Sequence, residues 1–396
     1  MKTGYKQTEI GVIPEDWAAS TIGEICEFSG GAQPPRSSFK FTPTKGYVRL
    51  IQIRDYKSDE FASYIPENLA RKRCSAEDIM IGRYGPPIFQ ILRGIEGAYN
   101  VALIRAIPTS EIDRLFIFYV LKQETLFLLI DALSRRSSGQ TGVEMPALKS
   151  FPLPLPPLPE QRAIAGALSE VDALLGAQEA LLAKKRDLKA AAMQQLLTGQ
   201  KRLPSFTGEW QVKTFGEVAS PKRDRIDPRS NGTQEFCVEL EHVESRSGKL
   251  LGSTSTGSNA SLKSIFHAGD VLFGKLRAYL RKYWIADRSG VCSTEFWVLA
   301  PKANAVANNF LFQVVQTDDF IEAASNAYGT HMPRSDWNII KNFTVHLPPF
   351  PEQTAIAAVL SDMDAEIAAL EAQRDKTRTL KQGMMQELLT GRIRLV

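Results

Sequence analysis

The sequence has few of the features that would place a protein in a membrane, in an oxidising compartment or around a metal cluster. Its 396 residues include four cysteines, far apart and without a CxxC pair. This argues against a disulfide framework or a zinc site and favours a reduced cytoplasmic protein. No run of 18 apolar residues exists, so no membrane span is expected. The N-terminal stretch MKTGYKQTEIGVIPEDW lacks the apolar core of a signal peptide.

The chain also lacks a strong charge of one sign and a recognisable catalytic constellation. Its net charge is +4, which says little about partners. The four histidines have no ligand-like spacing. The stretch GDVLFGKL from Gly269 to Leu276 fits GxxxxGK but lacks the Ser or Thr that would hold Mg²⁺. We see no glycine-rich S-adenosylmethionine loop, and we predict no catalytic residue and no metal site.

What the sequence does contain is a long internal repeat. Residues 155–203, beginning LPPLPEQ, return as residues 347–395, beginning LPPFPEQ, at a constant offset of 192. Of the 49 aligned pairs, 28 are identical, whereas random pairing would give roughly three. The two segments are therefore copies of one structural unit.

Each copy is expected to be one long helix. Pro159 and Pro351 suit the first helical position, and about 38 residues without proline follow. Apolar residues spaced by three, four or seven predict a seam along a helix on the order of 57 Å long. Thr198-Gly199 and Thr390-Gly391 predict left-handed glycine caps. The seam residues are Ile164, Leu168, Val171, Leu175 and Leu182, and then Ile356, Leu360, Met363, Ile367 and Leu370.

A seam of this length needs a partner, and the other copy carries the same seam. We therefore predict an antiparallel pair of helices, a coiled-coil spacer. Polar residues interrupt the seam at Gln178, Lys185, Arg374 and Thr377, where such residues set register at a cost in stability. The alternative is two ordinary amphipathic helices in separate domain cores, although helices in globular proteins average only about 11 or 12 residues.

The regions outside the repeat follow one plan twice. Short β-rich runs at residues 47–53, 78–81 and 99–104 predict strands, and residues 115–133 and 310–324 predict helices. The fold class is thus α+β: two mixed α/β domains separated by two long antiparallel helices, with a pseudo-twofold internal repeat. The predicted bounds are 1–150 for the first domain, 151–203 for the first helix, 204–346 for the second domain and 347–396 for the second helix.

With these features the chain resembles the specificity subunit of type I restriction–modification systems. The resemblance rests on LPPLPEQ and LPPFPEQ, the two LLTG helix endings, the stretch from Leu196 to Val218 and the N-terminal GVIPEDW. It implies two target-recognition domains that each read half of a split DNA site, on helices that set the gap. It further implies double-stranded DNA, two methyltransferase subunits and restriction/translocase subunits as partners. S-adenosylmethionine, ATP and Mg²⁺ would be bound by those partners, with no cofactor on this chain.

Residues that could contact DNA are basic, aromatic or amide side chains beside glycines or in polar loops. Arg pairs with guanine, Gln with adenine, and Lys and Arg hold phosphates. The alternative for the stretch KLRAYLRK at residues 275–282 is a solvated strand face. The candidates are Arg54, Arg83, Tyr84, Arg135, Arg136, Gln140, Lys275, Arg277, Tyr279, Arg281, Lys282, His331 and Arg334.

Two other functions remain open at the level of sequence. One is a DNA-binding scaffold of a stand-alone modification system that lacks a nuclease partner. The other is an enzyme whose active site lies in one of the mixed domains, and methyl transfer or DNA cleavage by the purified chain alone would reveal it.

Overall fold

The structure is a computed structural model, and it describes residues 4–135, 142–257, 260–302, 305–326 and 333–395. The chain divides into two compact units. Unit 1 comprises Met1–Gln178 and Gln373–Val396, and unit 2 comprises Glu179–Ala372. Each long helix therefore contributes one part to each unit. None of the described helices combines the length and the apolar character needed to cross a bilayer.

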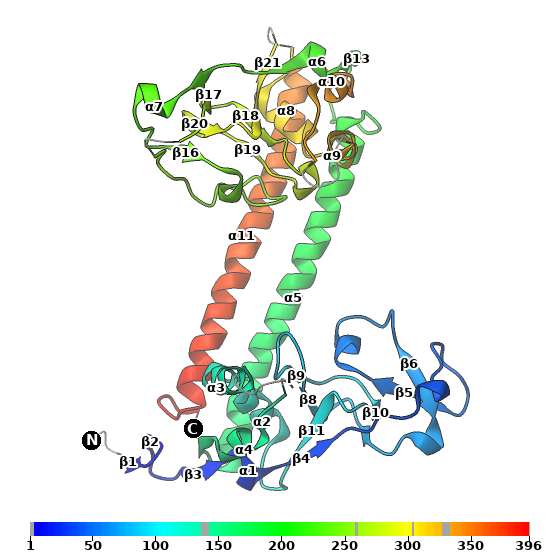
Figure 1. The fold of residues 1–396 in the computed structure, drawn as a ribbon, viewed down its shortest axis with the longest axis vertical. Coiled ribbons are helices and arrows are strands. Elements are labelled where there is room, and N and C mark those ends of the chain that lie inside the picture. Colours follow the sequence, from blue (N-terminus) through cyan, green and yellow to red (C-terminus); the bar gives the residue numbers. More distant parts are fainter. Residues whose placement is uncertain (1–3, 136–141, 258–259, 303–304, 327–332, 396) are drawn as a thin grey trace. The chain divides into compact units, whose positions relative to one another are not determined.

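The two units contain sheets of the same design (Figure 1). Each has one antiparallel four-stranded sheet, a second four-stranded sheet with one parallel pairing, and a two-stranded pair before its long helix. In unit 1 the orders are β4-β11-β8-β9, β6-β5-β10-β7 and β12-β3, with a further hairpin β1-β2. In unit 2 they are β14-β21-β18-β19, β15-β17-β20-β16 and β13-β22.

The strands of unit 1 are β1 Tyr5–Thr8, β2 Gly11–Pro14, β3 Ala18–Thr21, β4 Cys26–Gly30, β5 Tyr47–Ile51, β6 Ser63–Pro66, β7 Arg73–Cys74, β8 Ile79–Gly82, β9 Ile91–Leu92, β10 Gly97–Tyr99, β11 Leu103–Pro108 and β12 Pro152–Leu155. Those of unit 2 are β13 Gln211–Thr214, β14 Ala219–Pro221, β15 Arg225–Ile226, β16 Cys237–Val238, β17 Lys263–Phe266, β18 Val271–Gly274, β19 Tyr283–Ile285, β20 Gly290–Ser293, β21 Phe296–Pro301 and β22 Thr344–Leu347. The shorter helices are α1 Ile22–Ile25, α2 Arg114–Leu121, α3 Glu124–Ser134, α4 Met145–Ser150, α6 Phe215–Val218, α7 Pro228–Asn231, α8 Asn308–Val314, α9 Asp318–Ser325 and α10 Trp337–Ile340.

The repeat forms the two long helices, α5 Leu158–Leu197 and α11 Phe350–Leu388. Each begins one residue earlier than predicted, so the proline occupies the second helical position. A proline is tolerated there because the first N–H groups of a helix have no partner within the helix. Gly199 and Gly391 have φ values of 73° and 72°, which confirms the left-handed glycines predicted at the two ends.

The helix segments within each unit lie side by side and run antiparallel (Figure 1). In unit 1, Asp172 contacts Lys381 at 2.5 Å, while Gln178, further along α5, contacts Thr377 at 3.3 Å. In unit 2, Lys189 contacts Asp364 at 2.6 Å. Residue numbers rise along α5 as they fall along α11, so the predicted antiparallel pair is confirmed. The alternative, in which the two helices belong to separate domain cores without pairing, was wrong.

The core of each unit contains the start of one long helix and the end of the other. The main core of unit 1 includes Ile164 and Leu168 of α5 with Leu388 near the end of α11. The main core of unit 2 includes the aligned residues Ile356 and Leu360 with Leu196. Burial in two equivalent cores explains why these positions are identical in the two copies.

The PEQ sequence at each helix start is explained by buried hydrogen bonds. Glu160 accepts from Trp17 Nε1 at 2.9 Å and pairs with Arg394 at 2.7 Å. Glu352 likewise accepts from Trp210 Nε1 at 3.2 Å and pairs with Arg202 at 2.5 Å. The glutamines that follow, Gln161 and Gln353, accept from the backbone N–H groups of Asp113 and Ala307. Each copy thus attaches its own domain to its own helix.

Three predicted elements were wrong in extent. The strand expected at 99–104 is interrupted because the Asn100 side chain accepts from the Ala102 N–H, forming a turn between β10 and β11. The helix expected at 115–133 is two helices, α2 and α3, which separate at Lys122 and Gln123. The helix expected at 310–324 is also two, because Thr317 caps a new helix by accepting from the Phe320 N–H.

Candidate nucleic-acid interface

Many of the predicted DNA-contacting residues lie in two hairpin loops at equivalent places in the two units. In unit 1 the loop Arg83–Phe89 follows β8 and is closed by Gly82 N–H donating to Gln90 O at 2.8 Å. In unit 2 the loop Lys275–Arg281 follows β18 and is closed by Gly274 N–H donating to Lys282 O, also at 2.8 Å. All four closing residues correspond at the offset of 192, so the two loops share one backbone framework.

Two further backbone features of this framework recur. The carbonyl of Arg83 accepts from the Val143 N–H at 3.2 Å, and the carbonyl of Lys275 accepts from the Ser335 N–H at 2.8 Å. The last loop residue has positive φ in both, 58° at Phe89 and 53° at Arg281. Left-handed backbone costs a residue other than glycine about 1–2 kcal/mol, so surrounding contacts must hold it.

Both loops carry exposed arginine and tyrosine side chains. Arg83 and Tyr84 are exposed in unit 1, where the Arg83 guanidinium lies 5.4 Å from the centre of the Tyr84 ring. Arg277 and Tyr279 are exposed in unit 2. Within the described ranges, neither arginine forms an ion pair, and the Lys275 ammonium does not either. These guanidinium groups are therefore available to an external acceptor.

Other predicted residues are held within the protein. Arg334 forms a two-pronged pair with Glu295 at 3.0 Å, Arg281 pairs with Asp318, and Arg135 pairs with Asp131 at 2.7 Å. The Lys282 ammonium donates to the carbonyls of Leu240 and Val243 at 2.7 and 2.8 Å. These contacts must be exchanged before such a residue can bind DNA. Three predicted residues, Arg136, Gln140 and His331, lie outside the described residues.

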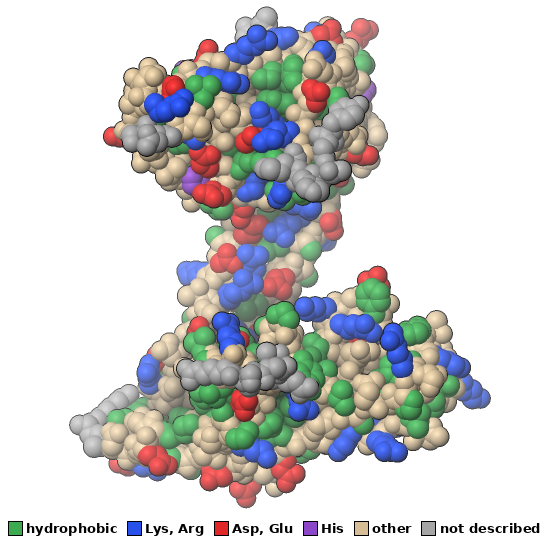
Figure 2. Space-filling model, in the orientation of Figure 1, with side chains coloured by type: hydrophobic (Ala, Val, Ile, Leu, Met, Phe, Trp, Pro, Cys, Tyr) green, Lys and Arg blue, Asp and Glu red, His purple; other side chains and the backbone are tan. Residues whose placement is uncertain are grey.

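Arg54 is not part of the hairpin loop but of the short 3-10 helix Ile53–Tyr56 after β5. Its guanidinium stacks on the exposed Phe61 ring at 5.7 Å. Figure 2 shows Lys and Arg side chains gathered over this part of unit 1. Lys45 and Lys57 are among the exposed basic residues of the same segment. This surface suits phosphate groups, because cations and backbone amides hold a duplex without reading its bases.

A cavity of about 1090 Å³ in unit 2 offers no comparable site for nucleic acid. It lies against the helix segments of that unit and is lined by charges that neutralise one another. Glu371 binds both Arg186 and Lys249, at 2.6 and 2.7 Å, and Arg281 binds Asp318. A wall of paired charges does not create the one-sign field that attracts a polyanion.

The comparison with known families decides the assignment. The family described as Type I restriction modification DNA specificity domain matches the chain twice, over residues 14–184 and 207–377. The two matches together cover well over half of the sequence. The chain belongs to this specificity family. Each match joins one mixed domain to most of the long helix that follows it.

Individual relatives agree with this assignment. The chain is 23% identical to the "Type I restriction enzyme MjaVIII specificity subunit" of Methanocaldococcus jannaschii, over 97% of the chain and 94% of the relative. It shares its fold with a type I restriction–modification S subunit from M. genitalium, with a TM-score of 0.56, 15% identity and coverage of 98% and 99%. A chain from a structure on "complex assembly" of "the type I R-M system" gives a TM-score of 0.59, at 16% identity and coverage of 96% and 99%. The predicted family, fold class and DNA-specificity function are confirmed.

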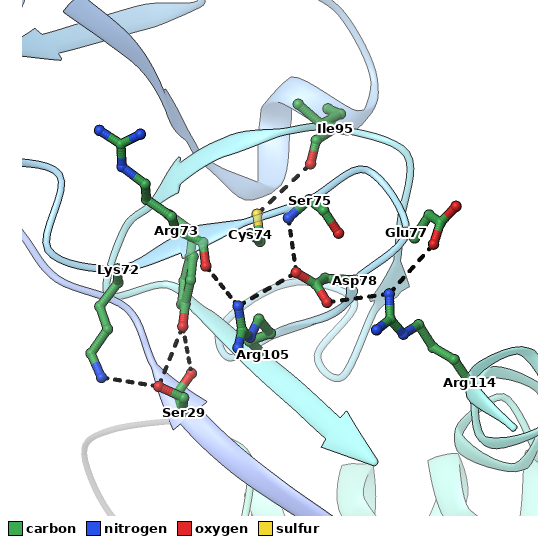
Figure 3. Close-up of polar contacts among 11 residues, drawn as sticks. Ser29, Lys72, Arg73, Cys74, Ser75, Glu77, Asp78, Ile95, Arg105 and Arg114 are labelled. Carbon is green, nitrogen blue, oxygen red and sulfur yellow. Dashed lines mark hydrogen bonds and ion pairs between the residues drawn. The ribbon is translucent and has the colours of Figure 1, made fainter. Parts of the chain in front are cut away.

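Sequence reasoning missed one shared feature of the two specificity domains, an aspartate before each hairpin strand that is half-buried in unit 1 and buried in unit 2. Asp78 accepts from the Ser75 N–H at 2.8 Å and contacts Arg105 and Arg114 at 3.4 and 3.7 Å (Figure 3). Its equivalent Asp270 accepts from the His267 N–H at 2.8 Å and from Lys222 at 2.6 Å. The stretches Asp78–Gly82 and Asp270–Gly274 align at the offset of 192, and this repetition in the sequence could have identified the shared aspartate. Both aspartates anchor the strand that leads into the loop.

The described part of the specificity chain contains no group of three or more His, Cys, Asp or Glu arranged to hold a metal. Burial raises the pKa of the Cys26 thiol to about 12 and of the Cys74 and Cys237 thiols to about 11. Burial also raises the pKa of Cys292. Neutral thiols are poor nucleophiles and poor metal ligands, so these cysteines serve packing.

Proposed function

We propose that this chain directs a type I restriction–modification complex to a bipartite DNA site, with each mixed domain reading one half. The observation that carries the proposal is the repeated hairpin framework, which presents different exposed side chains in the two units. Two unlike readers on one chain allow a site without palindromic symmetry, in contrast to the matched half-sites read by symmetric dimers. The domain bounds at 1–150, 151–203, 204–346 and 347–396 are part of this proposal.

The chemistry is assigned to partner subunits. Methyl transfer from S-adenosylmethionine would occur on two methyltransferase subunits, and ATP and Mg²⁺ would serve restriction/translocase subunits in the cytoplasm. This chain would bind double-stranded DNA and no cofactor. The adenine base as methyl acceptor follows from the family resemblance.

The test is to map modified bases by single-molecule sequencing of DNA from cells that express the chain with its methyltransferase. The expected result is one motif with two specified halves and an unspecified gap of constant length. The purified chain alone should bind DNA and leave it unmodified and uncut. Modification at a single continuous motif, or methyl transfer by the chain alone, would contradict the proposal.

Docking of a methyltransferase on each long helix is supported by exposed residues that are identical in the two copies. Leu188 and Leu380 occupy equivalent positions and are 48% and 58% exposed. Packing within the chain does not require an exposed leucine, yet both copies retain one. Lys184 and Lys376, also exposed and identical, lie one turn earlier. Two equal surfaces suit two copies of the same partner.

A matched pair of variants tests this docking surface. Leu188→Glu together with Leu380→Glu should weaken association with the methyltransferase by at least roughly tenfold, because a charge would replace apolar area that the bound partner buries. Leu174→Glu is the control, since Leu174 is 49% exposed on the same helix while the second copy has Glu366 at that position. Analytical ultracentrifugation would measure assembly. Equal loss in both variants, or in neither, would place the partner elsewhere.

The alternative of a stand-alone modification system differs only in lacking a nuclease partner. Co-purification of the tagged chain from its host distinguishes the two. Recovery of a translocase subunit supports the full restriction system, and recovery of the methyltransferase alone supports the alternative.

A further inference from the structure

We propose that the loops Arg83–Phe89 and Lys275–Arg281 determine which bases each domain reads, with Arg83 contacting the first half-site and Arg277 the second. This inference rests on the proposed function and deepens it. It selects two base-reading arginines from a larger set of basic residues on the two domains.

The framework of the two loops is constant, whereas the residues inside it differ. The closing bonds at Gly82 and Gly274, the carbonyl bonds to Val143 and Ser335, and the final positive φ all recur at the offset of 192. The residues inside the framework, RYGPPIF and KLRAYLR, differ at all seven positions. By contrast, 28 of 49 positions of the helical repeat are identical. A constant frame of closing contacts around variable residues is what an element of changeable specificity requires.

The exposed hydrogen-bond donors lie at different positions in the two loops. In unit 1 the exposed Arg and Tyr are the first and second residues of the loop, Arg83 and Tyr84. Ile88 and Phe89, at the end of that loop, are buried in the main core. In unit 2 the exposed Arg and Tyr are the third and fifth residues, Arg277 and Tyr279, around the buried Ala278. Equivalent loops thus present a guanidinium from different positions, which suits different bases.

Ion pairing distinguishes the candidate arginines from one another. An arginine held by a carboxylate must give up that ion pair before it can donate to a base. Arg281, Arg334 and Arg135 are held in this way. Arg83 and Arg277 form no ion pair within the described residues, so a guanine can accept two hydrogen bonds from either without that cost.

The loop of unit 2 is also preorganised. Arg277 itself has φ 53° and ψ 59°, and Arg281 has φ 53° and ψ 52°. Two left-handed residues flank the short 3-10 helix Ala278–Leu280, and Arg277 N–H donates to Pro333 O at 2.9 Å. A loop already held in one conformation loses less conformational entropy on binding than a mobile one. Unfavourable backbone retained in an exposed loop is characteristic of binding sites.

The experiment uses the assembled methyltransferase complex with the variants Arg83→Gln and Arg277→Gln, tested separately against a library of sites. A lost bidentate contact to a base lowers discrimination by roughly 5- to 150-fold. Arg83→Gln should therefore relax or change preference at one base pair of the first half-site by about that factor. The second half-site and the gap should stay unchanged. Arg277→Gln should do the same in the second half-site only.

Matched controls separate base reading from general DNA affinity. Arg73→Gln in unit 1 and Arg288→Gln in unit 2 remove half-exposed or exposed arginines that pair with Glu67 and Asp287 on the surface. Neither control should alter base preference. Thermal unfolding and methyltransferase assembly of all four variants should match those of the parent.

The outcomes are distinguishable. Uniformly weaker binding without a changed motif would assign Arg83 or Arg277 to phosphate contact and overturn the inference. Unchanged motifs in both variants would also overturn it while leaving the bipartite function intact. A parent complex without a bipartite motif would refute the proposed function and this inference together.

Discussion

At the scale of single residues, one buried glutamate joins each domain to its helix. Glu160 is 4% exposed and Glu352 is fully buried, and each binds a tryptophan and an arginine distant in sequence. The Glu160 and Asp16 carboxylates raise the pKa of the Arg394 guanidinium, which stays charged at any physiological pH. A buried carboxylate without its cation destabilises the fold, because water cannot solvate the charge and no counter-charge compensates it.

Arg394→Ala should therefore destabilise unit 1. We expect a loss of about 2–4 kcal/mol in the free energy of unfolding, since Glu160 would keep the Trp17 hydrogen bond but lose its counter-charge. Arg392→Ala is the control, because Arg392 lies two residues away, is exposed, and contacts Glu387 at 3.4 Å. The control should change stability by no more than about 0.5 kcal/mol. Chemical denaturation measures both, and equal values would show that the buried pair contributes nothing special.

At the scale of elements, the helix pair is stabilised by repeated cross-helix ion pairs and by one polar contact near its middle. Asp172–Lys381 and Lys189–Asp364 occupy equivalent positions in the two copies. The Gln178–Thr377 contact has no such counterpart, because the residue aligned with Gln178 is Leu370. The Oε1 atom of Gln178 is buried without a hydrogen-bond partner. This position is a weak point of the seam.

Gln178→Leu should stabilise the protein by about 1 kcal/mol, because it removes an unsatisfied buried carbonyl and gives the first copy the residue of the second. Thr377 would stay satisfied, since its hydroxyl donates to Gln373 O at 2.9 Å. Gln194→Leu, at an exposed position of the same helix, should bring no gain. Differential scanning calorimetry provides the comparison. A destabilised Gln178→Leu variant would mean that Gln178 is needed to hold the register.

At the scale of the whole molecule, the proposed function requires that the length of the long helices sets the gap between the two half-sites. Both long helices are continuous, with 40 and 39 residues. A helix rises about 1.5 Å per residue, whereas DNA rises about 3.4 Å per base pair. Adding residues to both helices should therefore change the gap without touching the loops that read bases.

Four residues inserted at facing positions, after Gln178 in α5 and before Thr377 in α11, test this relation. The insertion adds ~6 Å and roughly one helical turn, so the gap should lengthen by about two base pairs. Methylome sequencing should return both half-sites unchanged. Altered half-sites with the original gap would refute the role of the helices in spacing. Four alanine substitutions at exposed helix positions serve as the control for general perturbation.

The sequence by itself determined the features that depend on near neighbours and on repetition. Proline restricts its own backbone and that of the preceding residue, and a glycine after a helix adopts the left-handed cap, so both helix ends could be predicted within a few residues. The apolar period and the 192-residue offset identified two helices with matching seams. The family followed from the motifs at their ends.

Only the tertiary structure decided what depends on residues far apart in the chain. Trp17 meets Glu160, and Arg394 meets both Glu160 and Asp16. The candidate arginines were alike in sequence, yet folding places Glu295 on Arg334 and leaves Arg277 without an acid in the described structure. Whether a guanidinium is free to read a base depends on which carboxylate folding brings within about 4 Å of it. No local pattern contains that information.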